Sequence, residues 1–156
     1  MLKFHFDKMM DMGKIEQCLK EPGYVIIQTK GTSMWPLFTE GKSRVEIVSC
    51  EGKALRKGDI VLYRKNDDTL VLHRILKAAD EESFLVCGDH QWREIERIGK
   101  DEILGVVQGF YVKGSFVDDE TLWYRVYKKI WNGNLTIRRC CLAFLRLSGI
   151  EKRCLK

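Results

Sequence analysis

The sequence predicts a mainly β (α+β) protein: an antiparallel coiled sheet or partial barrel, with an N-terminal helix and C-terminal amphipathic helices. Three observations predict this class. Short apolar runs between residues 22 and 112 are separated by turn-like segments, with no helical pattern between them. Before these runs, the apolar residues of 7–20 recur loosely at helical spacing. After Gly114 the apolar period becomes helical again.

These observations divide the chain into a helical lead-in (1–21), a β-rich body (22–114) and a basic amphipathic helical tail (115–156). The first helix is expected to end at Glu21-Pro22-Gly23. Strands are expected at 24–28, 44–48, 60–63, 69–76, 84–87 and 103–112. In the tail, one helix starts at Leu122 and ends at 132–134, and a second runs from Leu135 to about Ile150.

Composition limits where the protein works. A chain of 156 residues with 45% hydrophobic and 31% charged residues fits one globular domain. Its six cysteines have irregular spacing and no C-x-x-C pair, which favours reduced thiols over a disulfide framework. No stretch has the roughly 20 apolar residues of a membrane span, and the first residues do not resemble a signal peptide. We therefore expect a cytoplasmic or peripherally membrane-associated protein without cofactor or metal.

The net charge of +5 is concentrated in the tail, where residues 121–156 carry nine Lys or Arg and one acid. Aromatic and basic residues on opposite sides of a helix fit an interfacial helix on an anionic membrane surface, through residues 121–150. Alternatively, Trp123, Tyr127 and Trp131 pack on the sheet as core. For the segment from Leu135 to Leu147 we favour membrane or partner binding. No DNA-binding motif accompanies this charge, so no nucleic-acid partner is expected.

Three residues form a candidate hydrolytic triad: Ser33, His73 and Asp89. Ser33 lies in a loop that Gly31 enters and Pro36 closes, which can expose a nucleophilic hydroxyl beside backbone N–H groups. Strand alternation places His73 on the face of Val71 and Ile75, where desolvation favours a neutral base. Asp89 follows a predicted strand and could orient the imidazole. Each residue alone is more often structural: a turn serine, a satisfied core histidine, a turn aspartate.

The order of several short motifs resembles that of a known family. The blocks are Gly31-x-Ser33-Met34-x-Pro36, Lys57-Gly58-Asp59-Ile60-Val61, His73-Arg74, Gly88-Asp89 and Ile103-Leu104-Gly105-Val106-Val107. Over about residues 22–112 they resemble the signal peptidase and LexA-type serine peptidase superfamily. The resemblance implies a coiled antiparallel β-structure with Ser33 as nucleophile. A histidine, where bacterial-type members have lysine, is similar to the endoplasmic-reticulum and archaeal signal peptidases, and implies His73 as base supported by Asp89.

Three features depart from that family pattern. Membrane-type members begin with a transmembrane anchor, and this sequence shows none. Many members carry a serine two residues before the nucleophile to help the oxyanion hole, and here this position is Gly31. The oxyanion and substrate contacts would then fall to Gly31, Thr32 and Met34, through a hydroxyl or backbone N–H groups. The further aspartate of the histidine branch is replaced by Ile95, between Glu94 and Glu96.

The sequence therefore predicts a serine endopeptidase that cleaves leader or signal-type peptides after a small residue, through an acyl-enzyme. The alternative is a catalytically inactive member of the fold that binds peptide or membrane. A self-cleaving regulator is disfavoured because only 32 residues precede Ser33. A zinc site is disfavoured because its candidate ligands lack paired spacing; they are His73, Cys87, Asp89 and His90. The oligomeric state stays open.

Overall fold

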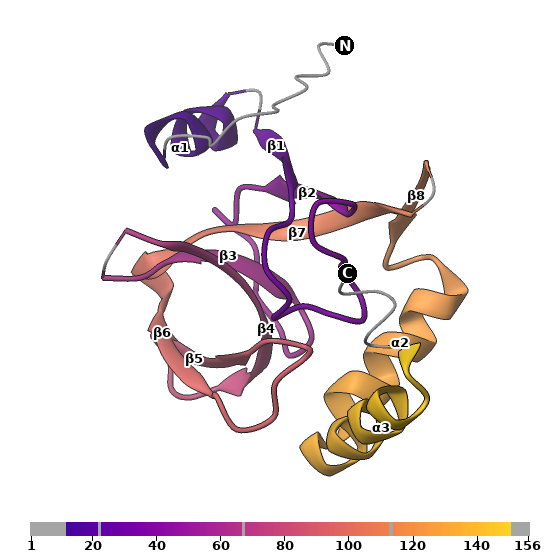
Figure 1. Ribbon diagram of the computed structural model, residues 1–156. Helices are drawn as coiled ribbons and strands as arrows, with labels where there is room; N and C mark the ends of the chain where they lie inside the picture. The colour runs from indigo at the N-terminus through magenta and orange to yellow at the C-terminus, as the bar shows by residue number, and fades with distance from the viewer. Residues whose placement is uncertain (1–11, 22, 67, 113, 151–156) are drawn as a thin grey trace.

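The computed structural model describes residues 12–21, 23–66, 68–112 and 114–150. In these ranges the chain forms one eight-stranded sheet and three α-helices (Figure 1), which confirms the mainly β, α+β class. The elements are α1 (Met12–Lys20), β1 (Tyr24–Gln28), β2 (Arg44–Val48), β3 (Ile60–Arg64), β4 (Leu70–Ala78), β5 (Ser83–Cys87), β6 (Glu96–Gly99), β7 (Ile103–Val112), β8 (Ser115–Asp118), α2 (Leu122–Gly133) and α3 (Leu135–Leu147).

The sheet has the order β1-β2-β7-β3-β4-β5-β6, and β8 pairs with β7. Every pairing is antiparallel. The strands β3 to β6 curl strongly (Figure 1), but β1 and β6 remain the two ends of an open sheet. In the β3–β4 hairpin, Val61 is the cross-strand partner of His73. This register places Tyr63, two residues farther along β3, on the same face of the sheet as His73.

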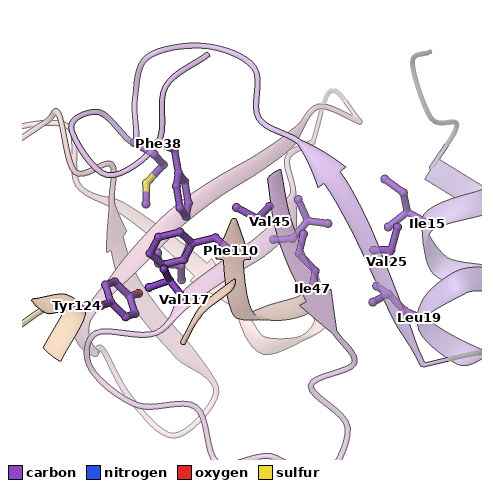
Figure 2. Packing of buried hydrophobic residues seen from close by; sticks show 12 residues of the cluster. Ile15, Leu19, Val25, Phe38, Val45, Ile47, Phe110, Val117 and Tyr124 are labelled. Atoms are coloured by element: carbon purple, nitrogen blue, oxygen red, sulfur yellow. The ribbon is translucent and has the colours of Figure 1, made fainter. Parts of the chain in front are cut away.

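Two hydrophobic clusters form the core on the two faces of the sheet. The first unites residues of α1, β1, β2, β3, β7, β8 and α2 with the loop between β1 and β2; Figure 2 labels Ile15, Leu19, Val25, Phe38, Val45, Ile47, Phe110, Val117 and Tyr124. The second comes from β3 to β7: Val61, Tyr63, Ile75, Phe84, Val86, Ile98, Ile103 and Val106. The apolar side chains of the strands supply both clusters by alternation, which is what a sheet covered on two faces requires.

Strand β4 shows this alternation most clearly. Leu70 and Leu72 pack against the first cluster, whereas Ile75 belongs to the second and Val71 packs against it. This confirms the predicted assignment of the two faces. His73 and its neighbour Arg74 therefore point to opposite sides of the strand.

Two strands were not predicted from the sequence. β6 is a short end strand in which Ile98 is the one apolar residue, so its composition is that of a charged loop. β8 lies within 115–156, the range expected to form the helical tail, and the helices begin only at Leu122. Of the predicted helix over 7–20, residues 7–11 lie outside the described residues, and α1 ends at Lys20 as expected.

The helices α2 and α3 pack beside each other and against the loop between β1 and β2, through a third cluster of Trp35, Trp131 and Leu142. Their outer faces keep apolar residues in solvent, among them Leu122, Val126 and Phe144. Of the three aromatic residues that could pack as core, Trp131 is buried and Tyr127 is half-buried, whereas Trp123 is 47% exposed. Membrane binding by the exposed faces stays a prediction. No helix in the described ranges is long and apolar enough to span a membrane.

Candidate active site

The loop that carries Ser33 is held by its neighbours. Gly31 has φ of +76°, a conformation that favours glycine. The side chains of Met34 and Trp35 are buried below the loop, and the Trp35 ring stands edge-on to His90 with ring centroids 5.3 Å apart. Ser33 itself is half-buried. The loop therefore rests on buried side chains and leaves its serine within reach of solvent.

The backbone of Ser33 is fastened to the segment that contains Asp89. The Ser33 carbonyl accepts a hydrogen bond of 2.8 Å from the N–H of His90. A Cβ on Gly88 would lie 2.5 Å from the same carbonyl oxygen, so only glycine allows this approach. Gly88 directly follows Cys87, the cross-strand partner of Arg74. The structure thus brings the Ser33 loop to the end of β5, next to the residue that follows His73.

His73 lies in the interior with 4% of its surface exposed. Its Nδ1 is 3.1 Å from the hydroxyl of Tyr63, and that hydroxyl donates a 2.7 Å hydrogen bond to Glu96 Oε2. Burial lowers the pKa of His73 to about 4, although the Glu96 carboxylate acts in the opposite direction. The imidazole is therefore neutral at pH 7, as the sequence pattern predicts.

The carboxylate of Asp89 is hydrogen-bonded to Arg74 and Tyr127, and not to His73. Its wholly buried carboxylate accepts two bonds from Arg74, 2.8 Å from Nε and 2.6 Å from Nη2, and a third of 2.9 Å from Tyr127. Burial alone would lower the pKa of Arg74, but the Asp89 charge raises it above its ordinary range. Among the described residues, no hydrogen bond joins Asp89 to His73 or Ser33 to His73. Asp89 does not reach His73 because adjacent residues of a strand point to opposite faces, and Asp89 lies on the face of Arg74.

The helix α3 contributes a buried residue to the same region. Arg138 donates hydrogen bonds to the carbonyls of Gly88 (3.0 Å), Gln91 (3.3 Å) and Trp131 (3.1 Å). Its Nη2 also lies 3.8 Å from Asp89. Trp131 completes the contact by donating its indole N–H to the Asp89 carbonyl. The side chain of Arg138 is wholly buried. Within the segment from Leu135 to Leu147, which the sequence predicts to bind a membrane or a partner, this arginine therefore belongs to the core.

The backbone beside Ser33 offers donors for an oxyanion. Within the described part of the chain, the N–H groups of Ser33 and Met34 donate no hydrogen bond, whereas the N–H of Trp35 bonds to the Thr32 carbonyl. Gly31 and Thr32 are exposed at the mouth of the loop. The residues named for this role thus lie together, on one turn.

Two further observations bear on cofactors. In the described ranges, no three His, Cys, Asp or Glu side chains come together in a group that could hold a metal ion. A cavity of about 520 Å³ is lined by Lys57, Asp119, Lys128 and other residues, but not by Ser33 or His73. That cavity is therefore separate from the candidate site.

Sequence reasoning missed Tyr63, Glu96 and Arg138. Tyr63 had a usable signal: a tight hairpin between two predicted strands pairs Val61 with His73, which puts Tyr63 on the histidine's face. Glu96 had a weaker signal, because it stands next to Ile95, the position of the further aspartate in the resembled family. Arg138 had none, since its contacts bridge 47–50 residues of sequence.

Comparison of the chain with protein-family models, with curated proteins and with solved structures finds no match.

Proposed function

We propose that the protein is a serine endopeptidase of the signal peptidase and LexA type, with Ser33 as nucleophile and His73 as general base. The observation that carries this proposal is His73 itself. It is a buried, neutral imidazole with one ring nitrogen facing the Tyr63 hydroxyl. Its neighbour Arg74 pairs with Cys87 at the end of β5, where the Ser33 loop rests. A general base needs an unprotonated nitrogen at the working pH, and His73 meets that need.

The chemistry would run by acyl transfer. Nε2 of His73 takes the hydroxyl proton of Ser33 as Oγ attacks the peptide carbonyl carbon. The resulting oxyanion accepts hydrogen bonds from the N–H groups beside Ser33, in the positions of Ser33 and Met34. The imidazolium then gives its proton to the leaving amine, and an acyl-enzyme remains on Ser33. Water, deprotonated in turn by His73, releases the acid and restores the serine.

Asp89 has a different part in this proposal from the one expected of a triad aspartate. Through Arg74 and the carbonyl contacts of Arg138, it holds the 88–91 segment on which the Ser33 carbonyl rests. Its charge still acts on His73 over distance, where it raises the pKa of the imidazole. Asp89 would therefore position the nucleophile loop.

One observation favours the alternative, an inactive member of the fold that binds peptide. The Asp89 carboxylate is fully engaged by Arg74 and Tyr127, so the expected Ser-His-Asp hydrogen-bond series is not formed. Hydrogen bonds of a catalytic site often tighten only when substrate binds. The reactivity of Ser33 therefore distinguishes a serine peptidase from an inactive protein that binds peptide.

The test is labelling by a fluorophosphonate probe, followed by cleavage of leader peptides with a small residue at the cleavage site. We expect the wild-type protein to be labelled, and Ser33→Ala and His73→Ala to lose the label. Ser115→Ala, which alters an exposed serine of β8, should label normally. If wild type is not labelled, or if Ser33→Ala cleaves peptides at the wild-type rate, the peptidase proposal is wrong.

We further propose that the outer face of α2 and α3 binds an anionic membrane surface, which would bring the site to membrane-bound substrates. Leu122, Val126 and Ile130 follow one another at four-residue spacing on α2 and are 45–74% exposed. On α3, Phe144 and Leu147 are 69% and 89% exposed. Exposed basic residues flank both stripes: Arg125, Lys129, Arg139 and Arg146. Apolar residues next to cations fit the boundary of an anionic bilayer.

Co-sedimentation with vesicles tests this surface. We expect binding to vesicles that contain phosphatidylserine, weaker binding to neutral phosphatidylcholine vesicles, and loss of binding in Phe144→Glu/Leu147→Glu. If the apolar face instead mediates self-association, the protein sediments as a dimer without lipid and the double variant is monomeric, which would contradict the membrane proposal.

A further inference from the structure

A series of contacts through the side chains of Lys65, Glu96 and Tyr63 leads from the surface to His73. Glu96 of β6 accepts a 2.7 Å hydrogen bond from Tyr63 of β3, and the Tyr63 oxygen lies 3.1 Å from His73 Nδ1. The second carboxylate oxygen of Glu96, Oε1, accepts a 2.7 Å hydrogen bond from Lys65 Nζ. Tyr63 is 1% exposed and His73 is 4% exposed, so water cannot freely replace either partner.

Proton counting decides the direction of the second hydrogen bond. A phenol has one proton to donate, and an ionised carboxylate can only accept. Burial would raise the pKa of Glu96, but the hydrogen bonds from Lys65 and Tyr63 hold it below its ordinary value, so Glu96 is ionised at neutral pH. Tyr63 therefore donates its proton to Glu96, and its oxygen remains an acceptor. In the 3.1 Å contact, the donor must be Nδ1–H of His73.

We propose that Tyr63 and Glu96 are positioning residues that hold His73 in the Nδ1–H tautomer and leave Nε2 as the unprotonated nitrogen. The tautomer follows from the contacts of Tyr63 with His73 and with an ionised Glu96, and the use of His73 as the base for Ser33 rests on the proposed function. Asp89 cannot set this tautomer, because it bonds to Arg74 and Tyr127 and not to the imidazole.

The same arrangement supports the charged state of the base. When Nε2 takes the Ser33 proton, Nδ1–H continues to donate to Tyr63, and no proton passes to Glu96. Three charged groups act on the imidazolium: Glu96 and Asp89 favour it, and Lys65 opposes it. Glu96 is the larger of the two favourable influences. A carboxylate thus assists the histidine through a tyrosine instead of by direct contact.

Nitrogen-15 NMR of the imidazole reads the tautomer without any need for activity. The chain has three histidines, and His73→Gln identifies the signals of His73 by their loss. We expect wild type to be protonated at Nδ1 at pH 7. Tyr63→Phe removes the acceptor, and Glu96→Leu frees the Tyr63 proton to turn toward Nδ1. Both changes should move His73 to the Nε2–H form.

Two controls keep the readout specific. Lys65→Met removes the other partner of Glu96 and should leave the Nδ1–H form in place. Tyr111→Phe removes a hydroxyl from β7 and should change nothing at His73. Thermal melting of each variant shows that it is folded before its spectrum is interpreted.

The outcomes separate this inference from the proposed function. A wild-type His73 protonated at Nε2, or Tyr63→Phe and Glu96→Leu variants that keep the Nδ1–H form, would overturn the inference. If the tautomer responds as expected but Ser33 is not labelled, the tautomer assignment stands and the peptidase proposal fails. If Ser33 is labelled, Tyr63→Phe should lower kcat about 10²-fold with little change in KM, since most molecules then lack a base.

Discussion

The buried pair of Arg74 and Asp89 allows a sharp test of what Asp89 does. In Asp89→Asn the side chain keeps its shape but loses its charge, and the Arg74 guanidinium stays in the interior. Removing one partner of a buried ion pair costs about 3–5 kcal/mol because the other charge is left uncompensated. The asparagine oxygen can still accept one of the three hydrogen bonds that the carboxylate receives. We therefore expect a loss near the lower end, about 3 kcal/mol.

Urea unfolding, followed by tryptophan fluorescence, measures this loss. With a denaturant slope of about 2 kcal/mol/M, the midpoint should fall by about 1.5 M. The matched control is Asp119→Asn, which breaks an ion pair with Lys128 in which the Asp119 side chain is 66% exposed. Exposed pairs contribute under about 1 kcal/mol, so the control midpoint should move by less than about 0.5 M.

A shift in Asp89→Asn no larger than that of the control would refute the reasoning. It would mean that Asp89 is not required to neutralise Arg74. A small shift together with a large loss of probe labelling would restore the triad role that the sequence suggests. The structure predicts the reverse: a large loss of stability and a loss of activity that follows from it.

Three further predictions concern neighbouring features. Arg138→Leu should lower stability by about 2–4 kcal/mol in calorimetry, because the carbonyls of Gly88, Gln91 and Trp131 each lose a hydrogen bond from its guanidinium; an unchanged melting temperature would contradict the role of these contacts. Because the pKa of folded His73 is about 4, kcat/KM should fall as pH drops through about 4 instead of 6.5. From pH 6.5 down to 4 the unfolded chain binds a proton there that the folded chain does not, so stability should also fall, and His73→Gln should remove that part of the pH dependence. Gly88→Ala should displace the Ser33 carbonyl and reduce probe labelling strongly, whereas Gly31→Ala meets no atom within 4 Å and should cost about 1–2 kcal/mol by backbone strain alone.

Much of the fold could be predicted because strands and helices leave local signals. The expected strands at 24–28, 44–48 and 103–112 have the observed bounds. Alternating apolar residues and turn-forming separators are read within a few residues, so long-range contacts are not needed. The strand β6 was not predicted because its sequence carries no such local signal. Its charged residues form a strand only because β5 lies beside it, with Phe84 opposite Ile98.

The site divides in the same way. The motif order singled out Ser33, His73 and Asp89, and alternation on β4 correctly placed the histidine on the face of Val71 and Ile75. Alternation also implies that Arg74 faces away from His73. The ion pair between Arg74 and Asp89 could not be predicted from the sequence, because the two residues are 15 positions apart and meet only through the pairing of β4 with β5.

Local patterns in the sequence were enough to predict the class of fold, most strand positions, the glycine-entered serine loop and a histidine in a desolvated position. Which side chain pairs with each charged group depended on how the elements pack. Contacts such as Tyr63 with Glu96, or Arg138 with Gly88, join residues 33 and 50 positions apart. A buried polar group takes the nearest partner with suitable geometry, and that partner is set by how strands and helices pack. Local sequence therefore specified the elements, and packing specified the chemistry between them.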